Sequence, residues 1–160
     1  MRVHIGGDHA AFDLHQALVE HLRAAGHEVV DHGPHTLDPL DDYPVFVLRA
    51  AEALRDDLAA GTEARGIVLG GSGNGEQMAA NKVAGIRAAL CYDTELARLA
   101  REHNDAQVIS IGGRMQSVEV AIEMVGVFLT TEFTGEERHQ RRIDMVGAYE
   151  ADGTLPPLPQ

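Results

Sequence analysis

Short apolar runs rich in β-branched residues alternate along the chain with longer stretches in which apolar residues recur at helical spacing. Helical spacing is clearest from Leu14 to Leu22, with Gly26 as a stop, and from Tyr43 to Ala60, with Gly61 as a stop. The apolar runs predict strands over residues 2–5, 28–31, 66–69, 87–92 and 107–111. Because helices of this length join parallel strands by right-handed crossovers, the pattern predicts an α/β fold around a parallel sheet.

The end of the chain follows a different pattern. Residues 136–150 predict a helix with Ile143, Val146 and Tyr149 as its apolar stripe, and no strand comes after it. We expect this helix to pack late, with a second subunit as a candidate surface. The last residues have three prolines and no periodicity, which predicts an extended tail. We therefore divide the chain into one domain, residues 1–150, and a tail, residues 151–160.

Composition narrows the class of protein. The chain has 160 residues, of which 44% are hydrophobic, enough for one compact domain without disulfides. Its single cysteine, Cys91, lies in an apolar run, which favours core packing and a reducing, cytoplasmic compartment. The apolar run at the start of the chain is too short for a secretory signal, and no apolar stretch is long enough to span a membrane.

Charge narrows the choice of partner. The formal net charge of −12 disfavours nucleic acid and anionic lipid, because both carry the same sign as the protein. A small phosphorylated substrate would be repelled at long range for the same reason. Such a substrate would therefore require a local basic cluster.

A glycine-rich segment, residues 69–78, follows the third predicted strand. Four of its residues are glycines, so backbone N–H groups can converge there on an anion: Gly70, Gly71, Gly73 and Gly75, with Ser72 and Asn74 between them. A helix predicted over residues 76–83 adds the positive end of its dipole. No Lys-Ser/Thr ends the loop, and Glu76 stands where a dinucleotide fingerprint requires glycine, so a nucleotide cofactor is disfavoured. A tight turn without a ligand is the alternative.

Glu76 has two interpretations. It can be a favourable acidic residue in the first turn of a helix, which carries no function. It can also act as a base that removes a proton from carbon while the neighbouring N–H groups hold the oxyanion that develops. Its position beside the glycine loop favours the second interpretation.

Two further pairs of polar residues follow predicted elements. Asp8 and His9 follow the first strand, at the carboxyl edge where parallel sheets bind ligands, although Asp8 can equally be a helix cap. His103 and Asn104 precede the last strand, at a helix C-terminus that favours a protonated imidazole; a left-handed cap at Asn104 is the bland alternative.

The basic cluster that a phosphate requires lies late in the chain. Arg138 and Arg142 are four residues apart and share a helical face, and two guanidinium groups can chelate a phosphate. A solvated face paired with nearby glutamates is the alternative. Arg114 follows the last strand and is expected at the carboxyl edge. No His/Cys ligand spacing occurs, so we predict no metal.

Taken together, these motifs resemble ribose-5-phosphate isomerase type B over about residues 1–150. The segments that carry the resemblance are Gly-Asp-His at 7–9, Asp-Tyr-Pro at 42–44, Gly-Ser-Gly-Asn-Gly-Glu at 71–76, Ala-Ala-Asn-Lys at 79–82, Glu-His-Asn at 102–104, Gly-Gly-Arg at 112–114 and Arg-His-Gln-Arg-Arg at 138–142. The chain is most similar to the actinobacterial branch, because many relatives have a catalytic cysteine where this chain has Gly70.

The resemblance implies a single-domain, Rossmann-like, three-layer α/β/α sandwich with a five-stranded parallel sheet. It implies interconversion of ribose 5-phosphate and ribulose 5-phosphate without a cofactor, with Glu76 moving a proton between C2 and C1. His103 would assist ring opening, and Ser72 with the backbone of 71–75 would stabilise the oxyanion. The substrate would be bound by Asp8, His9, Asn104, Arg114, Arg138 and Arg142, with part of this set lent by the second subunit of a homodimer.

Two alternatives stay open. The same family includes isomerases of six-carbon sugar phosphates such as allose or galactose 6-phosphate, and sequence does not decide sugar length. The chain can also be a binding module that senses a phosphorylated metabolite without converting it, since a fold does not imply a function. A sensor would have no need of a base at position 76.

Overall fold

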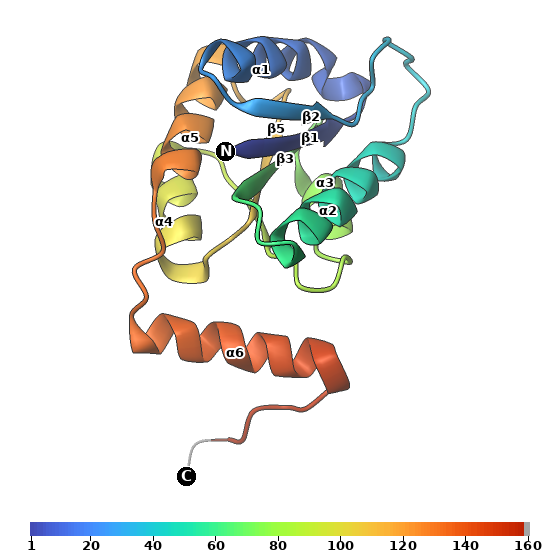
Figure 1. Cartoon of the computed structure of the whole chain (residues 1–160). Helices are drawn as coiled ribbons and strands as arrows, with labels where there is room; N and C mark the ends of the chain where they lie inside the picture. The colour runs from blue at the N-terminus through green and yellow to red at the C-terminus, as the bar shows by residue number, and fades with distance from the viewer. Residues whose placement is uncertain (159–160) are drawn as a thin grey trace.

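The computed structural model describes residues 1–158 and arranges them around a five-stranded sheet (Figure 1). The strands are β1 (Arg2–Gly7), β2 (Glu28–Asp31), β3 (Ala64–Gly70), β4 (Ala88–Leu90) and β5 (Val108–Gly112). Their order across the sheet is β2-β1-β3-β5-β4, and every neighbouring pair is parallel. The predicted five-stranded parallel sheet is confirmed, and the three longest strands lie side by side at its centre.

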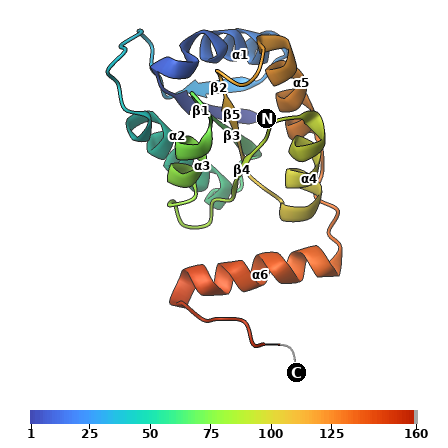
Figure 2. The same cartoon turned by 180° about the vertical axis from the view of Figure 1, so that it is seen from behind.

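Helices cover both faces of the sheet. They are the short 3-10 helix η1 (His9–Ala11), α1 (Phe12–Ala24), α2 (Tyr43–Ala59), α3 (Asn74–Ala80), α4 (Thr94–Asn104), α5 (Val118–Thr130) and α6 (Glu137–Asp152). The first, fourth and fifth α-helices pack on one face, and α2 and α3 pack on the other (Figure 2). Strand side chains alternate between the two faces, as Ile67 and Val68 do on β3. The predicted three-layer sandwich is therefore confirmed.

Some predicted boundaries were wrong. The helix after the glycine loop begins at Asn74 and ends at Ala80, whereas we expected residues 76–83. It starts early because Gly73 has a φ of 82°, a left-handed conformation that completes the turn within the loop. The fourth strand is shorter than the predicted residues 87–92, and α6 continues two residues beyond Glu150 to Asp152, where Gly153 caps it with a φ of 77°.

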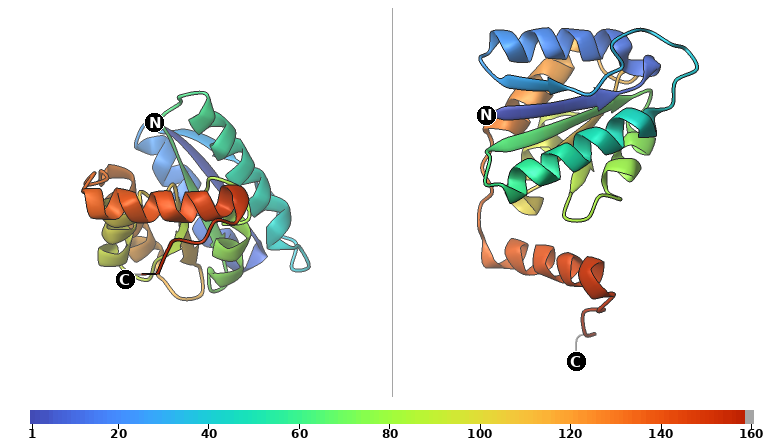
Figure 3. Two further views of the ribbon diagram at one scale, coloured as in Figure 1. Left: turned by 90° about the horizontal axis from the view of Figure 1, so that it is seen from below. Right: turned by 45° about the vertical axis from the view of Figure 1, so that its right-hand side comes forward.

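The last helix lies apart from the sandwich. Figure 3 shows α6 as a separate rod beside the body, and its contacts with the rest of the fold are mainly with α4. Met145, Val146 and Tyr149 are exposed on it, together with Leu155 of the following segment. Among the described residues, no helix is both long and apolar enough to cross a membrane. These apolar side chains are thus exposed to solvent in a single chain.

The edge strand β4 is held by a side chain as well as by its neighbour β5. The amide of Asn81 donates to the carbonyl oxygen of Ala88 at 2.9 Å and accepts from the N–H of Ala88 at 2.9 Å. Asn81 therefore takes the place of a further strand at this position of the sheet edge. An edge strand of three residues depends on such a partner, because unpaired backbone groups are costly when they are buried.

We expect Asn81→Ala to lower the free energy of unfolding by about 2 kcal/mol, since it leaves the N–H of Ala88 without a partner and the carbonyl oxygen of Ala88 with only the Gln77 amide, at 3.2 Å. Urea unfolding followed by circular dichroism measures this difference. Lys82→Ala is the matched control, because Lys82 is exposed one residue further on and should change stability by less than about 0.5 kcal/mol. Equal effects of the two substitutions on stability would contradict the role of Asn81 in the sheet.

Candidate functional site

The carboxyl ends of the three central strands meet at one edge of the sheet and form a pocket of about 440 Å³. Strand β1 leads into Asp8, β3 leads into the glycine loop, and β5 leads into Arg114. The residues around the pocket are Asp8, His9, Ala10, Tyr43, Gly71, Ser72, Gly75, Glu76, Arg114 and Met115. Polar groups separated by up to about a hundred positions thus converge at the edge where parallel sheets bind ligands.

The glycine loop is fixed from below by β5 and the turn after it. The buried hydroxyl of Ser110 donates to the carbonyl oxygen of Gly73 at 2.7 Å, and the N–H of Gly113 donates to that of Gly70 at 2.7 Å. Within the loop, Ser72 Oγ accepts from the backbone N–H and the side-chain amide of Asn74, at 3.3 and 3.2 Å. The Ser72 hydroxyl therefore keeps its own hydrogen for a ligand in the pocket.

The carboxylate of Glu76 occupies the space that a side chain at position 70 would fill. A Cβ atom built on Gly70 would lie 1.8 Å from Glu76 Oε1 and 2.1 Å from Glu76 Cδ. A side chain at position 70 and the carboxylate in its present position therefore exclude each other. The result is a carboxylate directly above the end of β3, with only 4% of the residue exposed.

Burial changes the chemistry of this carboxyl group. Desolvation raises the pKa of Glu76 above its usual value, and the charge of Asp8 acts in the same direction. The backbone N–H groups of Gly73 and Glu76 lower the pKa and offset part of this rise. A carboxylate of raised pKa is a stronger base, and it stands beside N–H donors that can hold a developing negative charge.

Asp8 and His9 lie on the opposite wall of the pocket. Asp8 accepts from the N–H of Ala10 at 3.0 Å, so it is also the helix cap that we weighed as an alternative. His9 Nδ1 lies 2.7 Å from Asp41 Oδ1. One ligand-capable atom from each of these three residues lies within 4.8 Å of the others. Because Nδ1 of His9 is engaged by Asp41, we interpret His9 and Asp41 as a hydrogen-bonded pair that lies beside Asp8.

Two residues shape the mouth of the pocket. Arg114 is exposed there and forms no ion pair with an acidic side chain of residues 1–158, so its guanidinium group is free to bind an anion. The ring of Tyr43 approaches the loop so closely that a Cβ on Gly75 would lie 2.7 Å from its Cζ atom. The pocket thus combines a buried carboxylate, hydroxyl and amide donors, and a cation at its rim.

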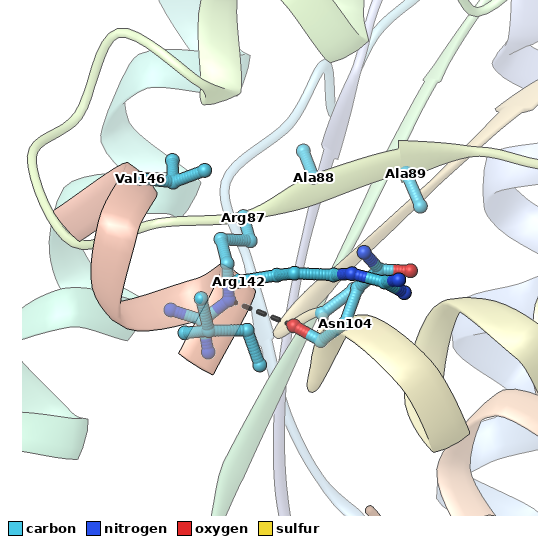
Figure 4. A pocket seen from close by; sticks show the side chains of 8 residues that line it. Arg87, Ala88, Ala89, Asn104, Arg142 and Val146 are labelled. Carbon is cyan, nitrogen blue, oxygen red and sulfur yellow. Dashed lines mark hydrogen bonds between the residues drawn. The ribbon is translucent and has the colours of Figure 1, made fainter. Parts of the chain in front are cut away.

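A second group of expected site residues lies elsewhere. Asn104 and Arg142 line another pocket, of about 390 Å³, together with Arg87 (Figure 4). The Nε atom of Arg87 donates to the carbonyl oxygen of Asn104 at 2.8 Å, which fixes the end of α4. Since α4 ends just before β5 begins, this pocket is at the amino edge of the sheet. The expected residues therefore form two groups at opposite edges.

His103 and Arg138 complete the second group less directly. The His103 ring stacks on the ring of His139 from α6, with centroids 4.2 Å apart and planes 13° apart. Burial lowers the pKa of His139, and the charge of His103 is the next largest cause. Both effects favour the neutral form of the His139 ring. Arg138 Nε lies 2.8 Å from Glu136 Oε2 on the solvent side, the paired surface that we gave as its alternative.

One local prediction was wrong, and several residues were missed. The left-handed residue after α4 is Asp105, with a φ of 42°, while Asn104 is the last helical residue. Asp41, Tyr43, Arg87 and His139 contact the expected site residues but were given no role. Tyr43 lies in the Asp-Tyr-Pro motif at 42–44, so its sequence context could have indicated a role in the site. Asp41 had no such sequence signal, since acidic residues are frequent in this chain.

Comparison with known proteins places the chain among sugar-phosphate isomerases. A family model described as Ribose/Galactose Isomerase matches residues 3–146. Ribose-5-phosphate isomerase B of Mycolicibacterium paratuberculosis is 50% identical over 159 residues, which are 99% of this chain and 98% of that protein.

Solved structures of ribose-5-phosphate isomerase B are also similar to this chain. Ribose-5-phosphate isomerase B of Clostridium thermocellum superposes with a TM-score of 0.88 at 39% identity, covering 96% of this chain and 100% of that one. The Mycoplasma genitalium enzyme, solved with bound ribulose 5-phosphate, has a TM-score of 0.88 at 38% identity, over 94% of this chain and 97% of that one.

The raised pKa of Glu76 generates a stability prediction. Because the folded-state pKa lies above the unfolded value, this group's contribution to stability is full below the unfolded pKa and is lost as pH rises through the folded pKa. Glu76→Gln removes the charge and should raise the free energy of unfolding on the order of 1 kcal/mol at pH 8. The gain should shrink toward pH 4, where the wild-type carboxyl group is protonated.

Urea unfolding of both proteins between pH 4 and pH 8 measures this gain. Glu52→Gln, an exposed glutamate on α2, is the control and should differ from wild type by less than about 0.5 kcal/mol at each pH. A difference between Glu76→Gln and wild type that is the same at every pH would contradict the buried-charge explanation.

Proposed function

The chain belongs to the ribose/galactose isomerase family, and on this basis we propose that it interconverts D-ribose 5-phosphate and D-ribulose 5-phosphate with Glu76 as the base. The observation that carries the role of Glu76 is its carboxylate, buried against Gly70 inside the pocket at the carboxyl edge. The relative with bound ribulose 5-phosphate supports a five-carbon substrate. The protein would work in the cytoplasm, where its buried free thiol Cys91 stays reduced.

The reaction needs a base, an oxyanion site and an anchor for the phosphate. Glu76 would take the proton from C2 of the open-chain aldose and return it to C1, passing through a cis-enediolate. The Ser72 hydroxyl and the N–H groups of residues 71–75 would stabilise the negative oxygen, an effect typically worth about 3 to 4 kcal/mol per donor in such chemistry. Asp8 and His9 would contact the substrate hydroxyls, and Arg114 would bind the phosphate. This scheme uses no cofactor.

The remaining roles require a second subunit. His103 would assist ring opening, Asn104 would bind a substrate oxygen, and Arg138 and Arg142 would bind the phosphate. These residues belong to the amino edge of the sheet, and β5 alone, with five residues, spans roughly 15 Å between the two edges. A pentose phosphate is too short to contact both groups within one chain.

A two-fold dimer resolves this separation. If the amino edge of one copy faces the carboxyl edge of the other, symmetry completes two identical sites at once. The exposed apolar residues of α6, which are Met145, Val146 and Tyr149, give such a contact a surface to bury. We therefore propose a homodimer whose active sites are shared between subunits.

A direct assay tests the reaction and the base. We expect purified protein to convert ribose 5-phosphate to ribulose 5-phosphate, with allose and galactose 6-phosphates as the competing substrates. Glu76→Gln should lower kcat by roughly 10²- to 10⁴-fold, the usual effect of losing a general base, with KM nearly unchanged. Gly70→Ala should also lower kcat, since its Cβ displaces the carboxylate.

Near-normal turnover by Glu76→Gln would overturn the assignment of the base. A preference for a six-carbon sugar would overturn the substrate but keep the mechanism. Binding of sugar phosphates without any conversion would identify a sensor in place of an enzyme.

The shared site is tested by mixing two inactive variants. When Glu76→Gln and His103→Ala are co-expressed with different tags, half of the dimers are mixed, and each mixed dimer has one intact site and one doubly altered site. The preparation should recover about one quarter of wild-type activity. Glu76→Gln with Asp8→Asn is the control and should recover none, because both residues belong to the same half-site. Equal recovery by both pairs would contradict a site shared between subunits.

A further inference from the structure

A buried carboxylate outside the proposed catalytic set holds His9. Asp41 lies in the loop between β2 and α2, 32 positions after His9 in the sequence. Its Oδ1 atom accepts from the backbone N–H of His9 at 2.9 Å and lies 2.7 Å from the Nδ1 atom of the His9 ring. The Asp41 side chain is 9% exposed, while that of His9 is 28% exposed toward the pocket. The backbone N–H and the ring nitrogen Nδ1 of His9 thus contact the same oxygen atom.

This contact determines how the imidazole faces the pocket. With Nδ1 donating its hydrogen to Asp41, the other ring nitrogen, Nε2, is left for a ligand. A ring held at its backbone and at Nδ1 loses much of the rotational freedom that an exposed histidine has. It therefore loses less conformational entropy when a ligand binds.

Asp41 is not needed to close its own loop. The turn that contains it is held by Asp38, whose Oδ1 accepts from the N–H of Leu40 at 3.0 Å and whose carbonyl oxygen accepts from the N–H of Asp41 at 3.1 Å. The Oδ2 atom of Asp41 is buried without a hydrogen-bond partner among the described residues. A carboxylate in that position has a desolvation cost that the loop alone does not offset.

We propose that Asp41 is a positioning residue for the isomerase reaction, which holds the His9 imidazole with Nε2 directed to the substrate so that it donates a hydrogen bond to the sugar phosphate. The inference rests on the proposed function of the pocket. It adds a residue that contacts no substrate itself and acts only through His9.

The surrounding charges favour the same arrangement. The hydrogen bond to Asp41 is the largest cause that raises the pKa of His9 above its usual value; partial burial opposes it, and the charge of Asp8 adds to it. Across the pocket, His9 faces Glu76 from α3 and Arg114 from the turn after β5. The protonated ring donates from both nitrogens, one to Asp41 and one to the ligand. In a chain of net charge −12, such a cation also helps to hold an anionic substrate.

The experiment compares Asp41→Asn with wild type. Asn keeps an acceptor oxygen at the same place but removes the charge, so the protein should fold while the titration of His9, followed by NMR and assigned with His9→Gln, moves to lower pH. KM for ribose 5-phosphate should rise by about tenfold, equal to 1.4 kcal/mol of binding, with kcat changed less than about threefold. The increase in KM should be largest at pH values between the two His9 titrations, where the ring is charged in the wild type and neutral in Asp41→Asn, and it should shrink at more alkaline pH.

Two controls separate positioning from a purely structural role. Asp56→Asn removes one negative charge from an exposed site on α2 and should leave the His9 titration and KM unchanged. In the His9→Gln background, Asp41→Asn should have no further effect on KM, because its action passes through the ring. An unchanged His9 titration, or the same rise in KM with and without His9, would overturn the proposal.

A measurement on the wild-type protein keeps the proposal testable if Asp41→Asn does not fold. The ¹⁵N shifts of the His9 ring report which nitrogen keeps its hydrogen when the ring is neutral. Hydrogen on Nδ1 supports the proposal, and hydrogen on Nε2 overturns it. Because this measurement needs no substrate, an absence of isomerase activity would refute the proposed function while the contact between Asp41 and His9 is judged separately.

Discussion

The geometry of the pocket depends on one steric exclusion, between the missing side chain of Gly70 and the carboxylate of Glu76. The carboxylate lies where a Cβ atom at the end of β3 would stand, so the proposed base lies directly above a central strand. Its position is set by rigid parts: Gly73 starts α3 at Asn74, and Ser110 and Gly113 tie the loop to β5. A base fixed in this way would lose little freedom when the substrate arrives, which is one way in which pre-organisation contributes to catalysis.

The strand order explains why distant polar residues meet at this base. Because β1, β3 and β5 are neighbours, the segments that follow them reach the same edge, and Asp8, Ser72 and Arg114 come together without long loops. The acidic background of the chain then has a local exception. Arg114 lies at a pocket that also contains two carboxyl groups, both with raised pKa values, and the hydrogen bond to Asp41 raises the pKa of His9 beside them. Groups that can attract a phosphate and a buried carboxylate of raised pKa thus line the same pocket.

Much of this could be predicted from sequence, and the failures have physical causes. Periodicity and glycine stops located the sandwich, and motifs at strand ends located Asp8, the glycine loop and Arg114. The steric requirement for glycine at position 70 could not be predicted, because the backbone conformation of a turn is already enough to explain a glycine there. Asp41 was missed because the contact joins two loops across 32 positions, and spacing patterns describe only neighbours on one element. Asp105 adopts the left-handed conformation predicted for Asn104 because α4 continues one residue further than its sequence indicated.

The order of helices and strands also supports the proposed dimer. In a parallel α/β sheet, every helix ends at the amino edge and every strand ends at the carboxyl edge, so residues at helix ends and residues after strands cannot meet within one copy. The proposed base after β3 and the imidazole at the end of α4 would therefore be complementary halves of one site. The proposed two-fold pairing would use each half once per site, and it would bury the exposed apolar residues of α6 and exclude water from the carboxylate. Assembly of the proposed dimer and the strength of the proposed base would then be coupled, because further desolvation would raise the pKa of Glu76 in the same direction as burial within one chain.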